Sequence, residues 1–560
     1  MMRIVIIALS ITLAIMIGFF VGARFFPFEA GLSDTQRMAA AEKLMGMSFT
    51  DEERELALED VLENRRHYGK IRQVSIPNPV PPALEFNPVV AGPEKTPPAD
   101  VPLQMSTLPD LTRPGEIEEL AFATVRELAE RIRTRQVTSE ELTRMYLDRL
   151  KRYDPELHCV ISLTENLALE QARRADQEIA QGIYRGPLHG VPYGLKDLFA
   201  VRGTKTTWGA KPYQDQVINQ DATVFRRLSD AGAVLVAKLS SGALAWGDVW
   251  YGEKTRNPWD TQQGSSGSSA GPASATAAGL VAFAIGTETW GSIVSPSTRC
   301  GTTGLRPTFG RVSRAGGMNL AWSMDKVGPI CRAVEDCALV LDAIRGADGF
   351  DREVVDRPFP YTPSVELKSL RIGYVKKLFE ADYDNRPYDE ATLSKLRDMG
   401  VQLVEIELPD LPVGDLAFIL NAEAAAAFDE MTRFNLDDQL VRQVRMAWPN
   451  VFRTARYIPA VEYIQANRLR YLVMERMKDL FAGIDVYIVP TYGGDNLLMN
   501  NLTGHPAVVL PNGFDDKSHP VSICFVGDLY DEATLLAAAK AYQDATSFHQ
   551  QRPARFAVSR

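Results

Sequence analysis

The chain has 560 residues, of which 45% are hydrophobic and 24% are charged, and these are ordinary values for a globular protein with a large core. Its formal net charge of -10 argues against a dominant interaction with nucleic acid or with anionic lipid, because both repel an acidic surface. We therefore expect no nucleic-acid partner.

The first residues predict a membrane segment. The stretch from Ile4 to Gly22 is uncharged and mostly apolar, and a helix needs about 20 such residues to cross a bilayer. It is longer than the apolar core of a signal peptide, so we favour an uncleaved signal anchor within residues 1–32. A cleaved signal peptide is the alternative, because the small residues at 21–23 would suit cleavage. The protein is therefore expected to be membrane-anchored or exported, in the cell envelope, with the membrane as a partner.

Residues 33–114 are expected to form a helical segment followed by a proline-rich linker. Thr50 and Glu53 have the spacing of a capping box, in which each side chain bonds to the other residue's backbone N–H at the start of a helix. From Ile76 to Pro109 the prolines of "PNPVPPALEF" and "KTPPADVP" prevent a helix and favour an extended strap or linker. We place the domain boundary near Pro114.

Residues 115–556 are expected to form one large domain. Capping boxes that begin at Thr124 and Thr138 predict two helices. Short apolar runs then alternate with helical stretches, and this alternation predicts an α/β fold in which helices cover a sheet. The apolar runs occupy residues 233–237, 280–285, 370–375, 401–406, 486–489 and 507–509.

The cysteines and histidines give no sign of a metal site. The chain has five cysteines and six histidines, and both are dispersed. An odd number of cysteines without paired spacing suits neither a zinc site nor a disulfide framework. No histidines have the spacing of metal ligands. We expect buried thiols at Cys159, Cys300, Cys331, Cys337 and Cys524, no metal and no cofactor.

The stretch "GTETWGSIVSPS" (Gly286–Ser297) follows the apolar run 280–285. A buried strand normally ends in a turn toward solvent. This one ends in small hydroxyl residues, among them Ser292, which is typical of a functional site.

The stretch "QGSSGSSAGPASATAAGLVAFAIG" (Gln263–Gly286) comes just before that turn. A flexible linker does not fit, because Pro272 can open a helix that the alanines continue. A phosphate-binding loop would need a lysine, and the stretch has none. Residues 267–271 match the G-x-S-x-G nucleophile elbow, but an elbow follows a buried strand and the preceding "RNPWDTQQ" (256–263) is polar. We therefore disfavour the elbow.

Together these motifs resemble the amidase signature family. That family carries a Gly/Ser-rich block, an alanine-rich helix and strand, a "GTxTxGS" turn and a Gly-Leu-Lys-Pro-Thr segment. The counterparts here are "GSSAG" at 267–271, "GTETWGS" at 286–292 and "GLRPT" at 304–308, followed by "GRVSRAGG" and "SMDKVGP". Upstream, "GPLHGVPYGLKDLFAVRGTKTTWGA" resembles the family's lysine block, and "NLTGHPAVVLPNGF" resembles its C-terminal block. The likeness covers about residues 120–550. It implies the amidase signature fold, a mixed β-sheet core covered by helices on both faces.

The resemblance also implies a catalytic triad of Lys196, Ser268 and Ser292. Ser292 aligns with the nucleophile of the turn, and Ser268 lies 24 positions upstream, where the family has a bridging serine. Lys196 stands in "GVPYGLKD", the family's lysine block. The bridging serine of the family follows a cis peptide bond, which implies one between Gly267 and Ser268.

The remaining site residues surround this triad. The tight backbone of Thr289, Trp290 and Gly291 can aim several N–H groups at the oxyanion of a tetrahedral intermediate. Gly267 and Ser269 are expected to support the bridging serine.

A serine and a lysine in this setting are suited to amide hydrolysis. A serine hydroxyl is a weak nucleophile until a base removes its proton. Burial disfavours the charged form of a lysine and can lower its pKa by several units, which makes the amine a usable base near neutral pH. A second serine between them can relay the proton in both directions.

Two positions depart from the family pattern. Many relatives have a small residue where Trp290 stands and an arginine where Val294 stands. Trp290 is either a packing residue or a wall of the acyl pocket, and both alternatives are open from the sequence.

The sequence thus predicts a hydrolase that cleaves the C–N bond of a small-molecule or peptide carboxamide through an acyl-enzyme at Ser292. One alternative is a glutaminase component of an amidotransferase complex, and the N-terminal apolar stretch argues against it because that role requires a cytosolic partner and tRNA. The other is a catalytically silent protein that uses the amidase fold to bind a partner.

Overall fold

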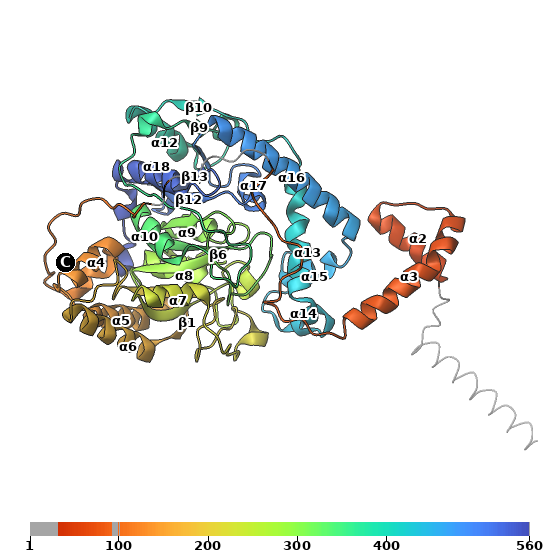
Figure 1. Ribbon diagram of the computed structural model, residues 1–560, viewed down its shortest axis with the longest axis horizontal. Helices are drawn as coiled ribbons and strands as arrows, with labels where there is room; N and C mark the ends of the chain where they lie inside the picture. The colour runs from red at the N-terminus through yellow and green to blue at the C-terminus, as the bar shows by residue number, and fades with distance from the viewer. Residues whose placement is uncertain (1–31, 92–98, 100, 559–560) are drawn as a thin grey trace, which may run out of the picture. The chain divides into compact units, whose positions relative to one another are not determined.

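The computed structural model describes residues 32–91, 99 and 101–558, and its elements carry the labels of Figure 1. The described chain divides into two compact units. The first ends at Ile76 and includes Tyr457–Pro459, and the second comprises Pro77–Arg456 and Ala460–Arg560.

The part of the first unit that the structure describes, from residue 32 on, holds two helices. They are α2 (Asp34–Met45) and α3 (Asp51–Ile71). The capping box predicted at Thr50 and Glu53 is confirmed, since the Glu53 carboxylate accepts the Thr50 N–H at 2.7 Å and the Thr50 hydroxyl accepts the Glu53 N–H at 3.2 Å. Arg54 of α3 forms an ion pair at 2.8 Å with the buried Glu42 of α2, which ties the two helices together.

The second unit is built on one mixed sheet of eleven strands. In spatial order these are β1 (Val160–Leu163), β3 (Val234–Leu239), β2 (Pro192–Lys196), β6 (Phe283–Glu288), β8 (Lys326–Cys331), β7 (Thr303–Arg306), β12 (Ala507–Phe514), β13 (Pro520–Gly527), β11 (Val486–Pro490), β9 (Ile372–Tyr374) and β10 (Leu403–Glu405). Strands β3, β2 and β6 run parallel to one another, as do β11, β9 and β10, whereas the other neighbours are antiparallel. A separate hairpin pairs β4 (Arg256–Asn257) with β5 (Asp260–Gly264).

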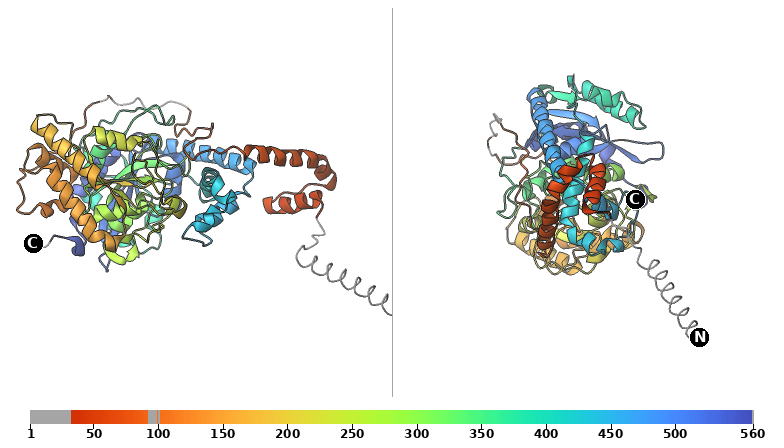
Figure 2. Two further views of the ribbon diagram at one scale, coloured as in Figure 1. Left: turned by 90° about the horizontal axis from the view of Figure 1, so that it is seen from below. Right: turned by 90° about the vertical axis from the view of Figure 1, so that its right-hand side faces the viewer.

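Helices cover both faces of this sheet, as Figures 1 and 2 show. Successive residues of a strand point to opposite faces, and Ile488 of β11 accordingly belongs to one hydrophobic core while its neighbour Val489 belongs to the other. Helices of the first core are α4 (Val125–Arg133), α5 (Ser139–Leu157), α6 (Glu165–Ala180), α7 (Thr223–Asp230), α10 (Val334–Ile344), α12 (Arg386–Asp398) and α18 (Glu532–Asp544). Those of the second are α13 (Phe418–Ala427), α14 (Asp429–Arg433), α15 (Trp448–Ala455), α16 (Ala460–Gly483) and α17 (Asn496–Thr503). The short helices α8 (Ala270–Ala277) and α9 (Val294–Cys300) share a small third cluster, and α11 (Lys376–Phe379) follows β9.

The predicted fold class is confirmed. Each of the six apolar runs identified in the sequence contains or overlaps one strand of the sheet, namely β3, β6, β9, β10, β11 and β12. The capping boxes at Thr124 and Thr138 begin α4 and α5.

The expectation of a membrane-anchored or exported protein is wrong. The apolar stretch of residues 4–22, on which it rested, lies outside the described residues. Within residues 32–91, 99 and 101–558, no helix is long and apolar enough to cross a bilayer. The longest described helix, α16, has 24 residues, but charged side chains such as Arg468 and Glu475 recur along it.

A buried ion pair lies next to the end of β2. Lys238 of β3 and Asp197, the residue after β2, are both fully buried, and the Lys238 Nζ lies 2.7 Å from the Asp197 carboxylate. The same carboxylate accepts the backbone N–H of Thr207 at 2.7 Å and its hydroxyl at 2.6 Å. The pair therefore joins two strands and a loop where the lysine of the predicted triad ends β2.

We expect Lys238→Met to lower the free energy of unfolding by about 3–5 kcal/mol, because it leaves the Asp197 carboxylate buried without its cation. Urea-induced unfolding followed by circular dichroism measures this change. Lys205→Met is the matched control, since Lys205 forms an exposed pair with Asp215 and its removal should cost less than about 1 kcal/mol. Equal losses in the two variants would contradict the prediction.

Candidate active site

The neighbouring strands β2 and β6 bring the lysine and the turn together. Lys196 is the last residue of β2, and Ser292 lies four positions after Glu288, the last residue of β6. The two strands are parallel, with Leu195 opposite Ile285. Because parallel strands end at the same edge of a sheet, the segments that follow them meet there.

The amine of Lys196 is surrounded by hydroxyl groups. Its Nζ lies 2.8 Å from the Ser268 Oγ, 2.8 Å from the Thr287 Oγ1 and 3.1 Å from the Ser269 Oγ. The side chain is fully buried. The structure therefore brings together the predicted lysine and bridging serine, which are 72 positions apart in the chain.

The hydrogen bonds around Ser269 indicate which way the protons point. The Ser269 hydroxyl donates to the Thr287 carbonyl at 3.1 Å, so towards Lys196 it can only accept. A neutral lysine amine has two protons and one lone pair. If the two protons are donated to the hydroxyl groups of Ser269 and Thr287, the lone pair remains for Ser268. The arrangement suits an uncharged lysine that accepts a proton from Ser268.

The electrostatic setting favours the same uncharged state. Burial lowers the pKa of Lys196 well below its ordinary value, and the negative charges of Asp325 and Glu288 offset only part of this effect.

The Gly/Ser segment connects the lysine to the turn. The peptide bond between Gly267 and Ser268 is cis, as the resemblance implies. A Cβ at Gly267 would lie 1.9 Å from the carbonyl oxygen of Gly247, so no side chain fits there. The N–H of Ser269 donates to the carbonyl of Ser292 at 3.1 Å and so holds the segment against the turn. The strand that precedes this segment, β5, belongs to the separate hairpin, which is not the setting of a nucleophile elbow.

The turn of residues 289–292 presents free backbone donors. Gly291 has a φ of +87°, a conformation that favours glycine, and its carbonyl accepts the N–H of Ser295 at 2.7 Å. Among the residues that the structure describes, no hydrogen bond uses the N–H groups of Thr289, Trp290 or Gly291. Ser292 is buried, with 8% of the residue exposed to solvent.

Trp290 is 46% exposed. This degree of exposure rules out the core-packing alternative for its side chain.

Glu288 fixes the backbone just after the nucleophile position. Its fully buried carboxylate accepts the N–H groups of Ile293 at 2.8 Å and Val294 at 2.9 Å, and it pairs with Arg306 at 2.9 Å and with the Asn501 amide at 2.9 Å. Burial would raise the pKa of Glu288, but the charge and hydrogen bond of Arg306 and the other donors lower it to about 2. The group is therefore a permanent anion that holds the start of α9.

Asp325 holds the other side of the turn. Its carboxylate accepts the hydroxyl of Thr289 at 2.5 Å and the N–H groups of Leu320 at 2.7 Å and Ala321 at 3.0 Å. Burial raises the pKa of Asp325, while these hydrogen bonds oppose the increase.

Sequence reasoning missed Thr287, Glu288 and Asp325 as site residues. Thr287 and Glu288 belong to the "GTETWGS" turn, and Asp325 belongs to "SMDKVGP", so both motifs contained the signal. What the sequence lacked was the pairing of β6 with β8, which places Glu288 opposite Lys326 and so brings Asp325 to the turn.

Comparisons with known proteins agree with this geometry. The sequence model of the Amidase family matches residues 141–498. A glutamyl-tRNA(Gln) amidotransferase subunit from Moorella thermoacetica is 34% identical over 78% of this chain and 99% of its own length. The corresponding subunit from Methylococcus capsulatus is 35% identical over 77% of this chain and 98% of its own. The structure of native peptide amidase from Stenotrophomonas maltophilia is 30% identical, with a TM-score of 0.68 over 77% of this chain and 98% of that chain.

The names of the two sequence relatives, which belong to a tRNA amidotransferase, also speak against the membrane-anchored or exported localisation. The family match spans more than half of the chain, and the relatives are matched almost from end to end. The chain therefore belongs to the amidase signature family, whose enzymes act on C–N amide bonds.

Proposed function

We propose that the protein hydrolyses a carboxamide to a carboxylate and ammonia or an amine, with Ser292 as nucleophile, Ser268 as proton relay and Lys196 as base. The observation that carries this proposal is the buried Lys196 amine, 2.8 Å from the Ser268 hydroxyl and surrounded by further hydroxyl groups. Burying an amine is costly, so an apolar side chain would serve a purely structural role at this position better than a lysine does.

Acylation begins with proton transfer away from Ser292. The Ser292 proton passes to Ser268 while the Ser268 proton passes to the lone pair of Lys196. The Ser292 oxygen then attacks the carbonyl carbon and forms a tetrahedral intermediate. The free N–H groups of turn 289–291 stabilise its negative oxygen.

The same path then runs in reverse. The protonated Lys196 returns a proton through Ser268 to the amide nitrogen, the C–N bond breaks, and a neutral amine leaves an ester on Ser292. A water molecule gives one proton to Lys196 along the same path while its oxygen attacks this ester. Lys196 returns that proton through Ser268 to the Ser292 oxygen as the C–O bond of the ester breaks, and the acid product loses its remaining proton to solvent and leaves as the carboxylate.

The second candidate is a glutaminase role within an amidotransferase, because two sequence relatives carry the name of a component of such an enzyme. The chemistry at Ser292 would be identical, with the side-chain amide of glutamine as substrate. Ammonia release from glutamine and from short, aromatic and long-chain primary amides distinguishes the two. Hydrolysis of glutamine alone would favour the glutaminase role, and hydrolysis of the other amides would favour a general amidase.

We expect a fluorophosphonate probe to label the wild-type protein at Ser292. Labelling should disappear in Ser292→Ala, which lacks the nucleophile, and should fall by at least about a hundredfold in Lys196→Arg, because a guanidinium does not give up its proton near neutral pH. Gel fluorescence and mass spectrometry of the labelled peptide measure this. Ser266→Ala is the control, since that neighbouring serine has no part in the mechanism. If wild type stayed unlabelled, the catalytically silent alternative would be correct.

We expect the labelling rate to rise with pH and to level off well below pH 10. Only the uncharged amine of Lys196 can take a proton, so the rate is low below its pKa and complete above it. Because burial lowers that pKa, the rise should be centred well below the ordinary lysine value of about 10.4. Second-order labelling rates between pH 5 and 10 test this. A rate still rising steeply at pH 10 would show that Lys196 is an ordinary, solvated lysine.

A further inference from the structure

The extended residues 77–91 are called the strap from here on. Its last residues are held against the second unit, since Pro88 and Val90 are buried and the backbone of Ala91 bonds to Tyr471 and Lys478. Before them, the strap has two anchors. At the first anchor, the side chain of Asn78 bonds to both backbone groups of Asn319. Its Nδ2 donates to the Asn319 carbonyl at 2.8 Å, and its Oδ1 accepts the Asn319 N–H at 2.9 Å. The Asn78 side chain thus bonds to both the N–H and the carbonyl of one residue, as a neighbouring β-strand would.

The second anchor is Phe86. Its N–H donates to the carboxylate of Glu353 at 3.0 Å, and its ring packs edge-on against Phe309 with centroids 4.9 Å apart. The guanidinium carbon of Arg470 lies 3.6 Å from the centre of the same ring. Both the backbone and the ring of Phe86 are therefore held by the catalytic unit.

Between Asn78 and Phe86 the strap does not pack closely against the rest of the second unit. A cavity of about 810 Å³ separates it from the domain, with Pro79, Pro82 and Glu85 on one side and Gly316 and Trp322 on the other. Leu84, near the second anchor, is 82% exposed. The span between Asn78 and Phe86 is therefore held at its two ends.

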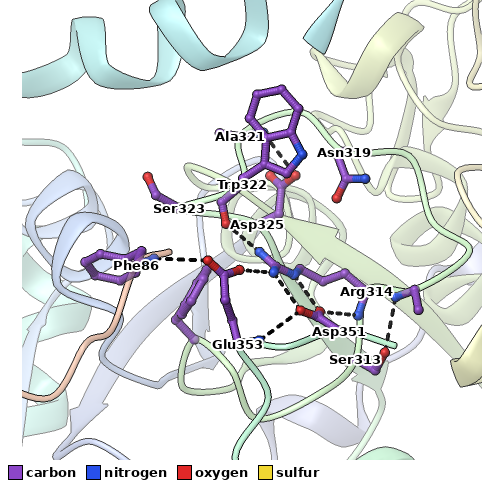
Figure 3. A network of polar contacts seen from close by, with 12 residues as sticks. Phe86, Ser313, Arg314, Asn319, Ala321, Trp322, Ser323, Asp325, Asp351 and Glu353 are labelled. Atoms are coloured by element: carbon purple, nitrogen blue, oxygen red, sulfur yellow. Dashed lines mark hydrogen bonds and ion pairs between the residues drawn. The ribbon is translucent and has the colours of Figure 1, made fainter. Parts of the chain in front are cut away.

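Both anchors act on loop 319–325. Asn78 bonds directly to Asn319. Figure 3 shows the second connection: Phe86 bonds to Glu353, the Glu353 carboxylate pairs with Arg314, and Arg314 donates to the carbonyl of Trp322. In addition, Arg470 beneath the Phe86 ring donates to the carbonyl of Ser323 at 2.8 Å.

Loop 319–325 in turn holds the catalytic turn. The N–H groups of Leu320 and Ala321, the two residues after Asn319, bind the carboxylate of Asp325. The other oxygen of that carboxylate accepts the hydroxyl of Thr289 at 2.5 Å. Asn78 is therefore connected to the turn of residues 289–291 through Asn319, Leu320, Ala321 and Asp325.

We propose that the strap is a positioning element of the active site: Asn78 and Phe86 fix loop 319–325, and Asp325 transmits that position to Thr289 and the turn of residues 289–291. This inference rests on the proposed function, because it assigns the turn to oxyanion binding. Asn78 and Phe86 are positioning residues that do not touch the substrate.

The test compares the rate of fluorophosphonate labelling in full-length Asn78→Ala, Phe86→Ala and Leu84→Ala. Asn78→Ala removes the hydrogen bonds to Asn319, and Phe86→Ala removes the ring that packs on Arg470, which itself binds Ser323. Each loss should lower the limiting rate constant at saturating probe by about three- to tenfold. The half-saturating probe concentration should stay constant, because the link acts on the transition state and not on probe binding. Leu84→Ala, a truncation on the same strap at an exposed position, should label like wild type.

A double-mutant cycle shows whether the effect passes through the turn. Thr289→Val removes the hydroxyl that binds Asp325, so adding Asn78→Ala to it should cause little further loss. A strap that merely stabilises the fold would lower the melting temperature of each variant and leave the limiting rate constant of the folded protein unchanged.

The outcomes separate the two proposals. Labelling of wild type with unchanged rates in Asn78→Ala and Phe86→Ala would overturn only the role of the strap. Full additivity of Asn78→Ala and Thr289→Val would overturn the route through Asp325. Absence of labelling in wild type would overturn the proposed function and this inference with it.

Discussion

The active site depends on an amine that the fold removes from water and surrounds with hydroxyl groups. Lys196 reaches this state because β2 lies between two parallel neighbours inside a covered sheet, where every residue of the strand is buried. The contrast with Lys238 on the adjacent strand is informative. Lys238 is equally buried, but a carboxylate lies 2.7 Å from its amine and stabilises the charge. Lys196 instead meets Ser268, Ser269 and Thr287, whose hydroxyl groups bond to an uncharged amine equally well.

Two carboxylates near this amine have both a structural and an electrostatic effect. Glu288 and Asp325 are buried carboxylates on the two sides of the turn, and both are occupied by backbone N–H donors. Their negative charges raise the pKa of Lys196 and so offset part of the lowering that burial causes. The same two carboxylates therefore fix the backbone of the turn and act on the charge of the neighbouring amine.

Much of this could be predicted from the sequence, and the limits have physical causes. The apolar runs of β3, β6, β9, β10, β11 and β12 marked strands because buried strands are continuous apolar stretches. Strand β2, "PYGLK", was not recognised as one, since it contains proline, glycine and the lysine itself. Lys196 and Ser268 were identified by resemblance to a family, because nothing local connects two residues 72 positions apart. The role of Asp325 needed the sheet register, and the membrane localisation was wrong because apolar length alone does not establish where a protein resides.

The parallel pairing of β2 with β6 has a further consequence. Neighbouring strands keep a spacing of about 4.8 Å that their backbone ladder sets, so the strands from which Lys196 and the turn of residues 289–292 extend stay at a fixed separation. Adaptation to new amides must therefore come from parts of the chain outside the ladder. Trp290, a residue that is 46% exposed and lies two positions before Ser292, is such a part of the chain, where a side chain can be exchanged without altering the strands.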